Sequence, residues 1–309
     1  MIHVLCRLKP KGPLHFGEME GMLEQSASHI PSDTLFSAIC CSWRLLFGKA
    51  SLNKLLKGFE AGKAPFIFSS AFPYLGQELY FPAPRHFSIK GRRWLAKARF
   101  EDALDGRLKQ SDLASAGSGR LNPDHWLFDA PRLGKGGPFS IARVNPPRDA
   151  GYFFLARFTE EKTRKDFDAA LRLLADEGIG GDRSSGCGFF HPPAWEEASF
   201  GSPGTYADAR CLLSMFYPKD DAEAGRLAGG YYGLKERRGR IQSPDKGRGL
   251  LWRPVRMAEE GSLVEGASEI TGRIVDVTPE DFKAHRIYRC GLAYSLACVS
   301  RIPAEAMAA

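Results

Sequence analysis

The sequence Gly178-Ile179-Gly180-Gly181-Asp182-Arg183-Ser184-Ser185-Gly186-Cys187-Gly188 places five glycines, one arginine and two adjacent serines in eleven residues. Glycine adopts left-handed backbone conformations and lets another chain approach its N–H groups closely. Successive free N–H groups form a concave anion site, and a guanidinium can bind a phosphate with two hydrogen bonds. The loop is therefore predicted to bind a phosphodiester backbone through the amides of Gly180, Gly181 and Gly186 and the side chains of Arg183 and Ser185. The other reading is a long glycine-rich turn without a ligand.

The segments on either side of the loop distinguish it from nucleotide-binding loops. Thr163–Glu177 carries Phe167, Leu171 and Leu174 at helical spacing, which predicts an amphipathic helix that ends at Gly178. Phe189-Phe190 and Pro192-Pro193 predict an extended segment after the loop. The predicted order is helix, loop, strand, whereas P-loops and dinucleotide-binding loops lie between a strand and a helix. No lysine follows Gly186, and Arg183 stands where GxGxxG requires its third glycine, so an ATP or NAD site is disfavoured and no cofactor is expected.

Basic residues are clustered along the chain. The 309 residues carry a net charge of +7 at pH 7, and 43% are hydrophobic, which is enough for two domains with cores of their own. Three stretches rich in Lys and Arg also contain aromatic residues: Phe81–Phe100, Pro131–Arg148 and Arg226–Arg256. Positive charge beside aromatic rings favours a polyanion whose bases can stack, as in single-stranded RNA.

Cysteine and carboxylate spacing indicates neither a disulfide framework nor a metal site. The seven cysteines are an odd number, and none forms a CxxC pair. Asp102 with Asp105, and Asp220 with Asp221, lie in charged runs without a supporting cluster of ligands. No apolar run of membrane-spanning length and no signal peptide are recognised, so a cytoplasmic protein without membrane contact is expected.

The first two hundred residues predict a split βαβ unit. Ile2–Leu8 reads as a strand, and residues 9–21 form a Gly/Pro-rich connection that carries His15 and Phe16. Ser32 or Asp33 is expected to cap a helix that runs to Gly48. Further strands are predicted at Phe66–Phe72, Glu78–Phe81 and Tyr152–Phe158. This order suits a ferredoxin-like domain.

The remaining segments are less regular. Residues 82–151 lack a strong period and are expected to contain a basic hairpin arm from about Pro131 to Phe154. Gly201–Thr205 marks a domain boundary. Beyond it, strands are predicted at Cys211–Tyr217, Gly261–Val264 and Ile274–Val277. His285–Val299 alternates with period two and predicts one half-buried strand.

These residues resemble the RAMP superfamily of CRISPR-associated RNA-binding proteins, and within it the tag-binding fourth subunits of the type III-A Csm effector complex. The resemblance is carried by Leu14-His15-Phe16-Gly17 with Ile30-Pro31-Ser32-Asp33-Thr34-Leu35-Phe36, by the central loop, by Gly230-Tyr231-Tyr232 with Arg237-Arg238-Gly239 and Glu260-Gly261-Ser262, and by His285-Arg286-Ile287-Tyr288-Arg289-Cys290-Gly291. Cys187 and Cys290 stand where an aromatic residue is more usual, and residues 90–121 match nothing in the family.

The resemblance implies an α+β protein with two ferredoxin-like (RRM-like) domains, at 1–200 with an inserted arm at about 82–150, and at 206–309. It implies a non-catalytic subunit of a ribonucleoprotein for antiviral defence. Such a subunit binds the repeat-derived 5′ tag of crRNA and contacts both the large polymerase/nuclease subunit and the first backbone RAMP subunit, and it meets target RNA only indirectly. The arm, around Arg132 to Arg148, would kink the guide where tag and spacer meet.

The expected RNA-binding residues come from the loop, the first connection, the arm and the second domain. They are Gly178, Gly180, Gly181, Arg183, Ser184, Ser185, Gly186, His15, Phe16, Ser32, Arg132, Arg143, Arg148, Arg237, Arg238 and Arg240.

Two other functions remain open from the sequence. His15 could be the general base of a CRISPR-transcript-processing endoribonuclease of the same superfamily, because cleavage by 2′-OH attack requires a base and an acid. That reading is disfavoured because such nucleases place the glycine-rich loop near the C-terminus. The chain could also be a structural scaffold that touches only protein. There is no HExxH or GxSxG motif.

Overall fold

The computed structural model describes residues 2–17, 26–87, 93–109, 126–134, 137–198, 200, 206–242 and 249–300, with the backbone alone for 127–134 and 137–139. The elements are β1 (Ile2–Leu8), α1 (Ser32–Glu60), β2 (Phe66–Phe68), β3 (Phe72–Leu75), β4 (Glu78–Pro82), β5 (Trp94–Ala96), α2 (Lys97–Leu104), β6 (Leu127–Gly134), β7 (Gly137–Val144), β8 (Ala150–Phe158), α4 (Glu161–Glu177), the short 3₁₀ helix η2 (Arg183–Ser185), β9 (Ala194–Glu197), β10 (Ala209–Leu212), α5 (Asp221–Ala228), β11 (Leu234–Arg237), β12 (Val255–Ala258), β13 (Leu263–Glu265), β14 (Gly272–Asp276), β15 (Tyr288–Leu292) and β16 (Ser295–Cys298).

The main sheet has the strand order β5-β4-β3-β8-β1-β9, and β2 also pairs with β8. β8 is its central strand, and it pairs antiparallel with β1 from Ile2↔Phe158 to Leu8↔Tyr152. Eight of its nine residues are buried, which shows that both faces of the sheet are covered at this strand. A strand covered on both faces reads as a continuous apolar run, as β8 does.

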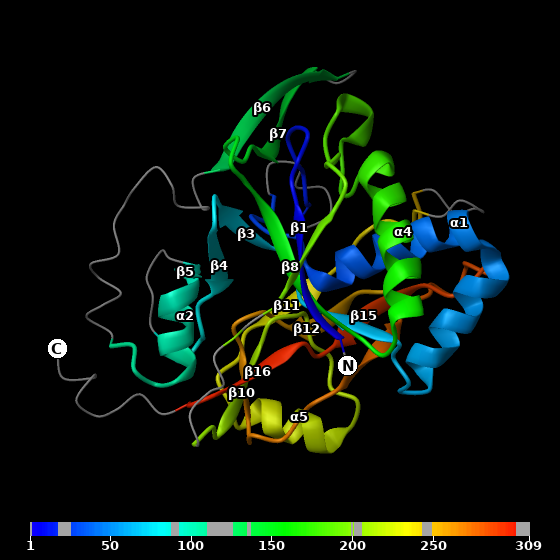
Figure 1. Ribbon diagram of the computed structural model, residues 1–309. Helices are drawn as coiled ribbons and strands as arrows, with labels where there is room; N and C mark the ends of the chain where they lie inside the picture. Colours follow the sequence, from blue (N-terminus) through cyan, green and yellow to red (C-terminus); the bar gives the residue numbers. More distant parts are fainter. Residues whose placement is uncertain are drawn as a thin grey trace.

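One face of the main sheet is covered by α1 and α4, which pack against each other (Figure 1). Tyr152, Phe154 and Phe158 of β8 belong to the core on this side. Phe167 of α4 lies beneath them, with its ring centroid 4.9 Å from that of Phe66. The predicted spacing of Phe167, Leu171 and Leu174 is confirmed, because all three are buried in α4.

The opposite face is covered by α2 and by the second half of the chain. Phe153 and Leu155, which alternate with the residues facing α4, share a core with Cys211, Leu213 and Leu263. The second half contains the sheet β13-β10-β16 and the hairpins β11–β12 and β14–β15. Its residues Ile274, Cys290 and Leu292 also enter the core beneath α1. The two halves therefore share both of their largest cores.

Helix α1 differs from the prediction at both ends. It begins at Ser32, and Pro31 at the N-cap provides no side-chain hydrogen bond, so neither Ser32 nor Asp33 is the cap. Gly48, where the helix was expected to end, has φ 81° and ψ 170° and kinks it, and the helix continues to Glu60. α1 is the one helix in the described part of the chain with the length and composition to span a membrane. Core helices of soluble proteins meet the same criterion, and in α1 the apolar residues are interrupted by Arg44, Gly48 and Lys49.

Several other elements correct the sequence-based expectations. The segment His285–Val299 is two strands, because β15 pairs with β14 while β16 pairs with β10 in another sheet. β5, α2 and α5 were not predicted. The Asp220 side chain accepts a hydrogen bond from the Glu223 amide and caps α5, so it has a structural role. Among the described residues, no group of three or more His, Cys, Asp or Glu side chains is arranged to hold a metal ion.

A two-stranded arm is present, with different limits from those predicted. β6 and β7 pair from Leu127↔Val144 to Gly134↔Gly137 and project from one end of the main sheet (Figure 1). The arm was predicted to reach Phe154, but residues 150–158 form β8 in the centre of the sheet. The boundary predicted at Gly201–Thr205 lies outside the described residues.

Candidate nucleic-acid interface

The glycine-rich loop begins directly at the end of α4 and closes on itself. Gly178, with φ 77°, ends the helix, and its amide donates to the Leu174 carbonyl at 2.8 Å. The Ile179 amide donates to the Gly188 carbonyl at 3.0 Å, which joins the two ends of the loop. A Cβ at Gly188 would lie 2.2 Å from the Ile179 oxygen, so this closure requires glycine.

The loop is held against the connection that follows β1. The Gly181 amide donates to the His15 carbonyl at 2.9 Å, and the Gly188 amide donates to the Pro13 carbonyl at 2.9 Å. A Cβ at Gly180 would lie 2.3 Å from the His15 oxygen, and one at Gly181 would lie 2.7 Å from the His15 ring. Gly180 and Gly181 therefore permit close contact between two protein segments.

Two of the three amides predicted to bind phosphate are used within the protein. The Gly181 amide donates to the His15 carbonyl, and the Gly186 amide donates to the Arg183 carbonyl at 3.0 Å. In this conformation both amides therefore donate to carbonyl groups of the protein. Ser184, Ser185 and Gly186 form the exposed tip of the loop.

Arg183 joins the loop to the second half of the chain. Its guanidinium donates to the Gln242 side-chain oxygen at 3.0 Å and to the Glu177 carbonyl at 3.3 Å. Arg240, two residues before Gln242, is exposed and donates to the Gly249 carbonyl at 2.6 Å. Two segments expected to bind RNA from separate domains therefore meet at one place.

Lys9 and Lys11 lie on the same surface and were not selected from the sequence. Both are exposed, the Lys11 amide donates to the Phe189 carbonyl at 2.9 Å, and neighbouring Gly12 lies against the Gly186 backbone. The alternation Lys9-Pro10-Lys11-Gly12-Pro13 was the signal that could have found them. We call this surface the loop face; it comprises Lys9, Lys11, Arg183, Ser184, Ser185 and Arg240.

Five of the predicted RNA-binding residues are buried: His15, Phe16, Ser32, Arg143 and Arg237. His15 is 5% exposed, and its Nδ1 lies 2.7 Å from the Ala142 carbonyl oxygen. Phe16 packs edge-on against Tyr152. The Ser32 hydroxyl accepts a hydrogen bond from the Met215 amide at 3.0 Å. In this fold these side chains are directed at protein groups, and we do not include them in the proposed RNA contacts.

Arg143 forms an ion pair with Asp182 of the loop, with both side chains largely buried. Asp182, with φ 55°, is the one non-glycine residue of the described chain with a left-handed backbone. Burial raises the pKa of the Asp182 carboxyl, but hydrogen bonds from Ser185 and Arg143 outweigh it and hold the pKa below its usual value. The pair joins the base of the arm to the loop.

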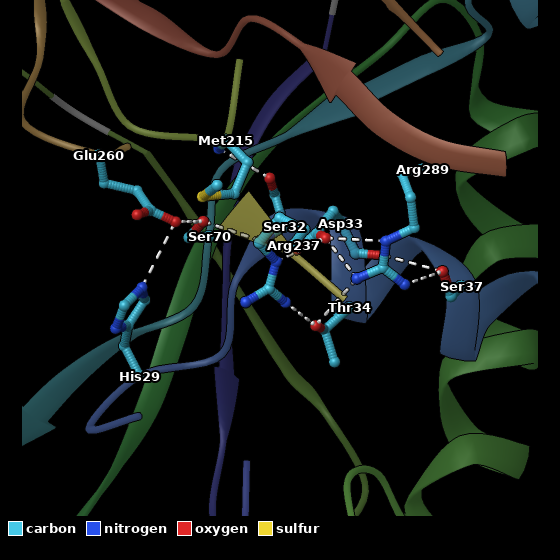
Figure 2. Close-up of polar contacts among 10 residues, drawn as sticks. All are labelled: His29, Ser32, Asp33, Thr34, Ser37, Ser70, Met215, Arg237, Glu260 and Arg289. Atoms are coloured by element: carbon cyan, nitrogen blue, oxygen red, sulfur yellow. Dashed lines mark hydrogen bonds and ion pairs between the residues drawn. The ribbon is translucent and has the colours of Figure 1, made fainter. Parts of the chain in front are cut away.

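Arg237 belongs to a buried cluster between the two halves of the chain (Figure 2). The fully buried Asp33 carboxylate accepts hydrogen bonds from Arg237 and Arg289, each through Nε at 2.9 Å. Arg237 also donates to the Thr34 hydroxyl at 2.9 Å, and Arg289 donates to the Ser37 hydroxyl at 3.1 Å. Burial raises the pKa of Asp33, but the two guanidinium charges outweigh it and lower the pKa. Arg237 therefore holds α1 to the second half.

A second buried contact joins the halves through Glu260 (Figure 2). Ser70 donates its hydroxyl proton to Glu260 and accepts a hydrogen bond from the Ser32 amide at 2.8 Å. His29 Nε2 lies 3.4 Å from the same carboxylate. Burial raises the pKa of Glu260, but attraction to His29 and the hydrogen bond from Ser70 outweigh it and lower the pKa to about 2.

The other predicted residues lie apart from the loop tip. Arg148 is exposed in the turn between β7 and β8, beside Gly76, whose amide donates to the Asp149 carbonyl at 2.7 Å. Arg238 is exposed and paired with Glu236. Arg132 pairs through its backbone with Phe139 in the arm, and its side chain lies outside the described part.

Comparison with known proteins gives matches over most of the chain. A curated protein of Mycobacterium tuberculosis (strain CDC 1551 / Oshkosh), named CRISPR system Cms protein Csm4, is 27% identical over 250 residues, covering 74% of this chain and 77% of its own. A protein of the same name from Thermococcus onnurineus (strain NA1) is 28% identical over 235 residues, covering 65% and 71%.

Solved structures share the fold. A chain of a crystal structure of a Csm3–Csm4 subcomplex in the type III-A CRISPR-Cas interference complex has a TM-score of 0.67 at 19% identity, covering 96% of this chain and 99% of that one. A chain of a Csm1–Csm4 cassette in complex with cA4 has a TM-score of 0.63 at 20% identity, covering 97% and 98%.

Family models match both halves. The C-terminal part, residues 205–298, matches the model described as the CRISPR Csm4 C-terminal domain. Residues 7–191, more than half of the chain, match the model of the RAMP superfamily. The chain therefore belongs to the RAMP superfamily, and its second half carries the C-terminal domain of Csm4 proteins.

Proposed function

We propose that this chain is the subunit of a type III-A CRISPR effector complex that holds the repeat-derived 5′ tag of crRNA on the loop face, without cleaving it. Relatives that match about three quarters of the chain are named Csm4. Structures with the same fold are described as complexes of Csm4 with Csm1 and with Csm3. By analogy, the partners of this chain are the large polymerase/nuclease subunit and the first backbone RAMP subunit, with target RNA met only indirectly.

The contact between Arg183 and Gln242 is the observation that carries the RNA-binding proposal. It places the exposed tip of the glycine-rich loop beside the basic segment of the second half. Guanidinium and ammonium groups bind phosphate with charge-assisted hydrogen bonds, and serine hydroxyls add neutral ones. Lys9, Lys11, Arg183 and Arg240 supply four positive charges on this face, of which Lys11 is paired with exposed Asp176. Arg148, Arg238 and Arg132 are proposed as contacts outside it.

The architecture supports two ferredoxin-like domains, proposed at 1–200 with the arm inserted and at 206–309. The order β9-β1-β8-β3 with α1 and α4 on one face is that of a ferredoxin-like sheet. The order β16-β10-β13 with α5 suits a reduced version of the same unit. A cytoplasmic location without membrane contact accords with such a complex.

The nuclease alternative is weakened by the surroundings of His15. A general base must reach the 2′-OH of its substrate, but this ring is buried and directed at the Ala142 carbonyl. Incubation of labelled repeat RNA without metal tests this directly. We expect intact RNA, and cleavage abolished by His15→Ala would overturn the non-catalytic assignment.

RNA binding is tested by fluorescence anisotropy with a single-stranded RNA that begins with the tag, over a series of salt concentrations. Arg183→Ala and Arg240→Ala should each weaken binding about tenfold and reduce the slope of log K against log salt by about 0.7, the value for one phosphate contact in a single strand. The matched control is Arg164→Ala, which lies near the other end of α4, about 20 Å away by helical rise.

Two outcomes would contradict the assignment. Equal affinities for Arg183→Ala, Arg240→Ala and Arg164→Ala would show that the loop face does not hold the RNA. Binding that does not change with salt in the wild-type chain would favour a scaffold that contacts only protein.

A further inference from the structure

The base of the arm, the connection after β1 and the glycine-rich loop meet at one junction. Leu14 and Val144 exchange two backbone hydrogen bonds, at 2.9 and 2.8 Å. On the other side of the same connection, the His15 carbonyl accepts a hydrogen bond from the Gly181 amide of the loop. Residues 14–15 therefore lie between the last strand of the arm and the loop, bonded to both.

Side chains cross this junction in two places. The His15 ring bonds the Ala142 carbonyl of β7 while Gly181 lies against its Cδ2 edge. One residue along β7, Arg143 reaches past the connection to the Asp182 carboxylate. The Cys187 sulfur also lies 3.7 Å from that carboxylate. The Arg143 and Asp182 side chains are only 10% and 13% exposed.

The left-handed backbone of Asp182 indicates that its carboxylate has a role at this position of the loop. A left-handed conformation is unfavourable for most residues with a Cβ and less so for aspartate and asparagine, whereas glycine adopts it freely. The loop contains glycine at five positions and a carboxylate at this one. A largely buried guanidinium left without its carboxylate is strongly destabilised, so the pair resists separation of arm and loop.

We propose that Arg143 and Asp182, together with His15 of the connection after β1, are positioning residues that fix the direction of the arm relative to the loop face. This inference rests on the proposed function, in which one RNA strand touches both the loop face and the arm. The pair then sets how many nucleotides separate the phosphate contacts on the loop from the point where the arm meets the strand. It has this effect without touching RNA.

Asp182→Asn tests the pair with little disturbance of the backbone, because asparagine tolerates left-handed conformations. The control for the exchange measurement is Asp176→Asn, which removes one negative charge near the end of α4, where it pairs with exposed Lys11. Both variants raise the net charge by one, so their difference isolates the junction.

The first measurement is hydrogen exchange of the full-length free protein. In Asp182→Asn we expect the amides of Leu14 and Val144 to exchange at least about tenfold faster than in Asp176→Asn, while amides inside α4 stay unchanged. Arg143→Met should give the same result, and Arg143→Lys, which keeps the charge, should restore most of the protection. Equal exchange in the Asp182→Asn and Asp176→Asn variants would overturn the inference.

The second measurement is hydroxyl-radical footprinting of tag RNA on the same proteins. In Asp182→Asn we expect protection at the loop-face nucleotides to remain and protection further along the strand to weaken or spread. A footprint identical to that of Asp166→Asn, which makes the same change in charge at an exposed pair with Lys162 outside the loop face, would overturn the positioning role. If the wild-type chain protects no nucleotide, the proposed function fails, and the exchange data alone decide whether the pair fixes the arm.

Discussion

Gly180 and Gly186 belong to the same loop, and their backbones have similar φ values of 89° and 85°. Their surroundings differ, because a Cβ at Gly180 would overlap the His15 carbonyl whereas one at Gly186 would meet open space. Gly186→Ala should therefore cost only the left-handed backbone energy, about 1–2 kcal/mol. Gly180→Ala adds steric overlap and should cost at least about 3 kcal/mol. Urea unfolding followed by circular dichroism measures both, and equal losses would show that the loop does not pack against His15.

Asp33 neutralises two buried guanidinium groups, so its charge matters more than that of a surface carboxylate. Asp33→Asn leaves Arg237 and Arg289 without a counter-charge and should lower the free energy of unfolding by about 3–5 kcal/mol. The control Asp166→Asn removes one exposed pair with Lys162 and should cost less than about 0.5 kcal/mol. Chemical denaturation of both variants tests the difference, and a loss in Asp33→Asn no larger than in the control would contradict the structural role.

At the scale of elements, Glu260 contacts Ser70 in the connection between β2 and β3. This contact makes the free energy of unfolding depend on pH. The folded pKa of about 2 lies below the ordinary value of 4.5, so the carboxylate stabilises the fold above about pH 4.5, and this contribution is lost as the pH falls towards 2. Glu260→Gln should therefore be less stable than the wild type at pH 7. The two proteins should converge as the pH falls through this window.

The measurement is urea unfolding at a series of pH values from 7 to the lowest at which the protein still folds. Glu265→Gln is a suitable control because this residue is exposed at the end of β13. A constant difference between Glu260→Gln and the wild type at every pH would contradict the assigned role of the charge.

Elements with a strong local pattern could be predicted from the sequence. β1 has the predicted limits, and α4 begins two residues before the predicted start. The break within His285–Val299 could not be predicted, because the alternation is continuous and the split is decided by two different partners, β14 and β10. α2 could not be predicted because it is short and carries several charged residues. Only three of its side chains are buried: Phe100, Ala103 and Leu104.

The position of the loop in the candidate site could be predicted from the sequence, but the roles of the individual basic residues could not. The sequence identified the exposed residues Ser184 and Ser185, and it placed Arg183 in the loop. It assigned RNA contact to Arg237 because a basic run resembles a surface, whereas its partner Asp33 lies 204 residues earlier in the chain. Buried arginines and exposed ones have the same local pattern, and only the tertiary partner distinguishes them.

At the scale of the whole molecule, the shared cores predict a single unfolding transition. Phe153 and Leu155 of β8 pack against Cys211 and Leu263 of the second half, so neither half can lose its structure without exposing apolar surface of the other. Tryptophan fluorescence and far-UV circular dichroism should report one coincident midpoint in urea. Leu155→Ala should lower the free energy of unfolding by about 2–5 kcal/mol without separating the two signals. Two resolved transitions in the wild type would show that the halves fold independently.

The pairing of β1 with β8 also determines when the main sheet can form during translation. Ile2 is translated long before its partner Phe158, which follows the whole arm in the sequence. At about 5–20 residues per second, the first strand waits on the order of ten to thirty seconds with its edges open. A chain whose synthesis stops before β8 would leave both edges of β1 without their partners β8 and β9, and unpaired strand edges favour aggregation.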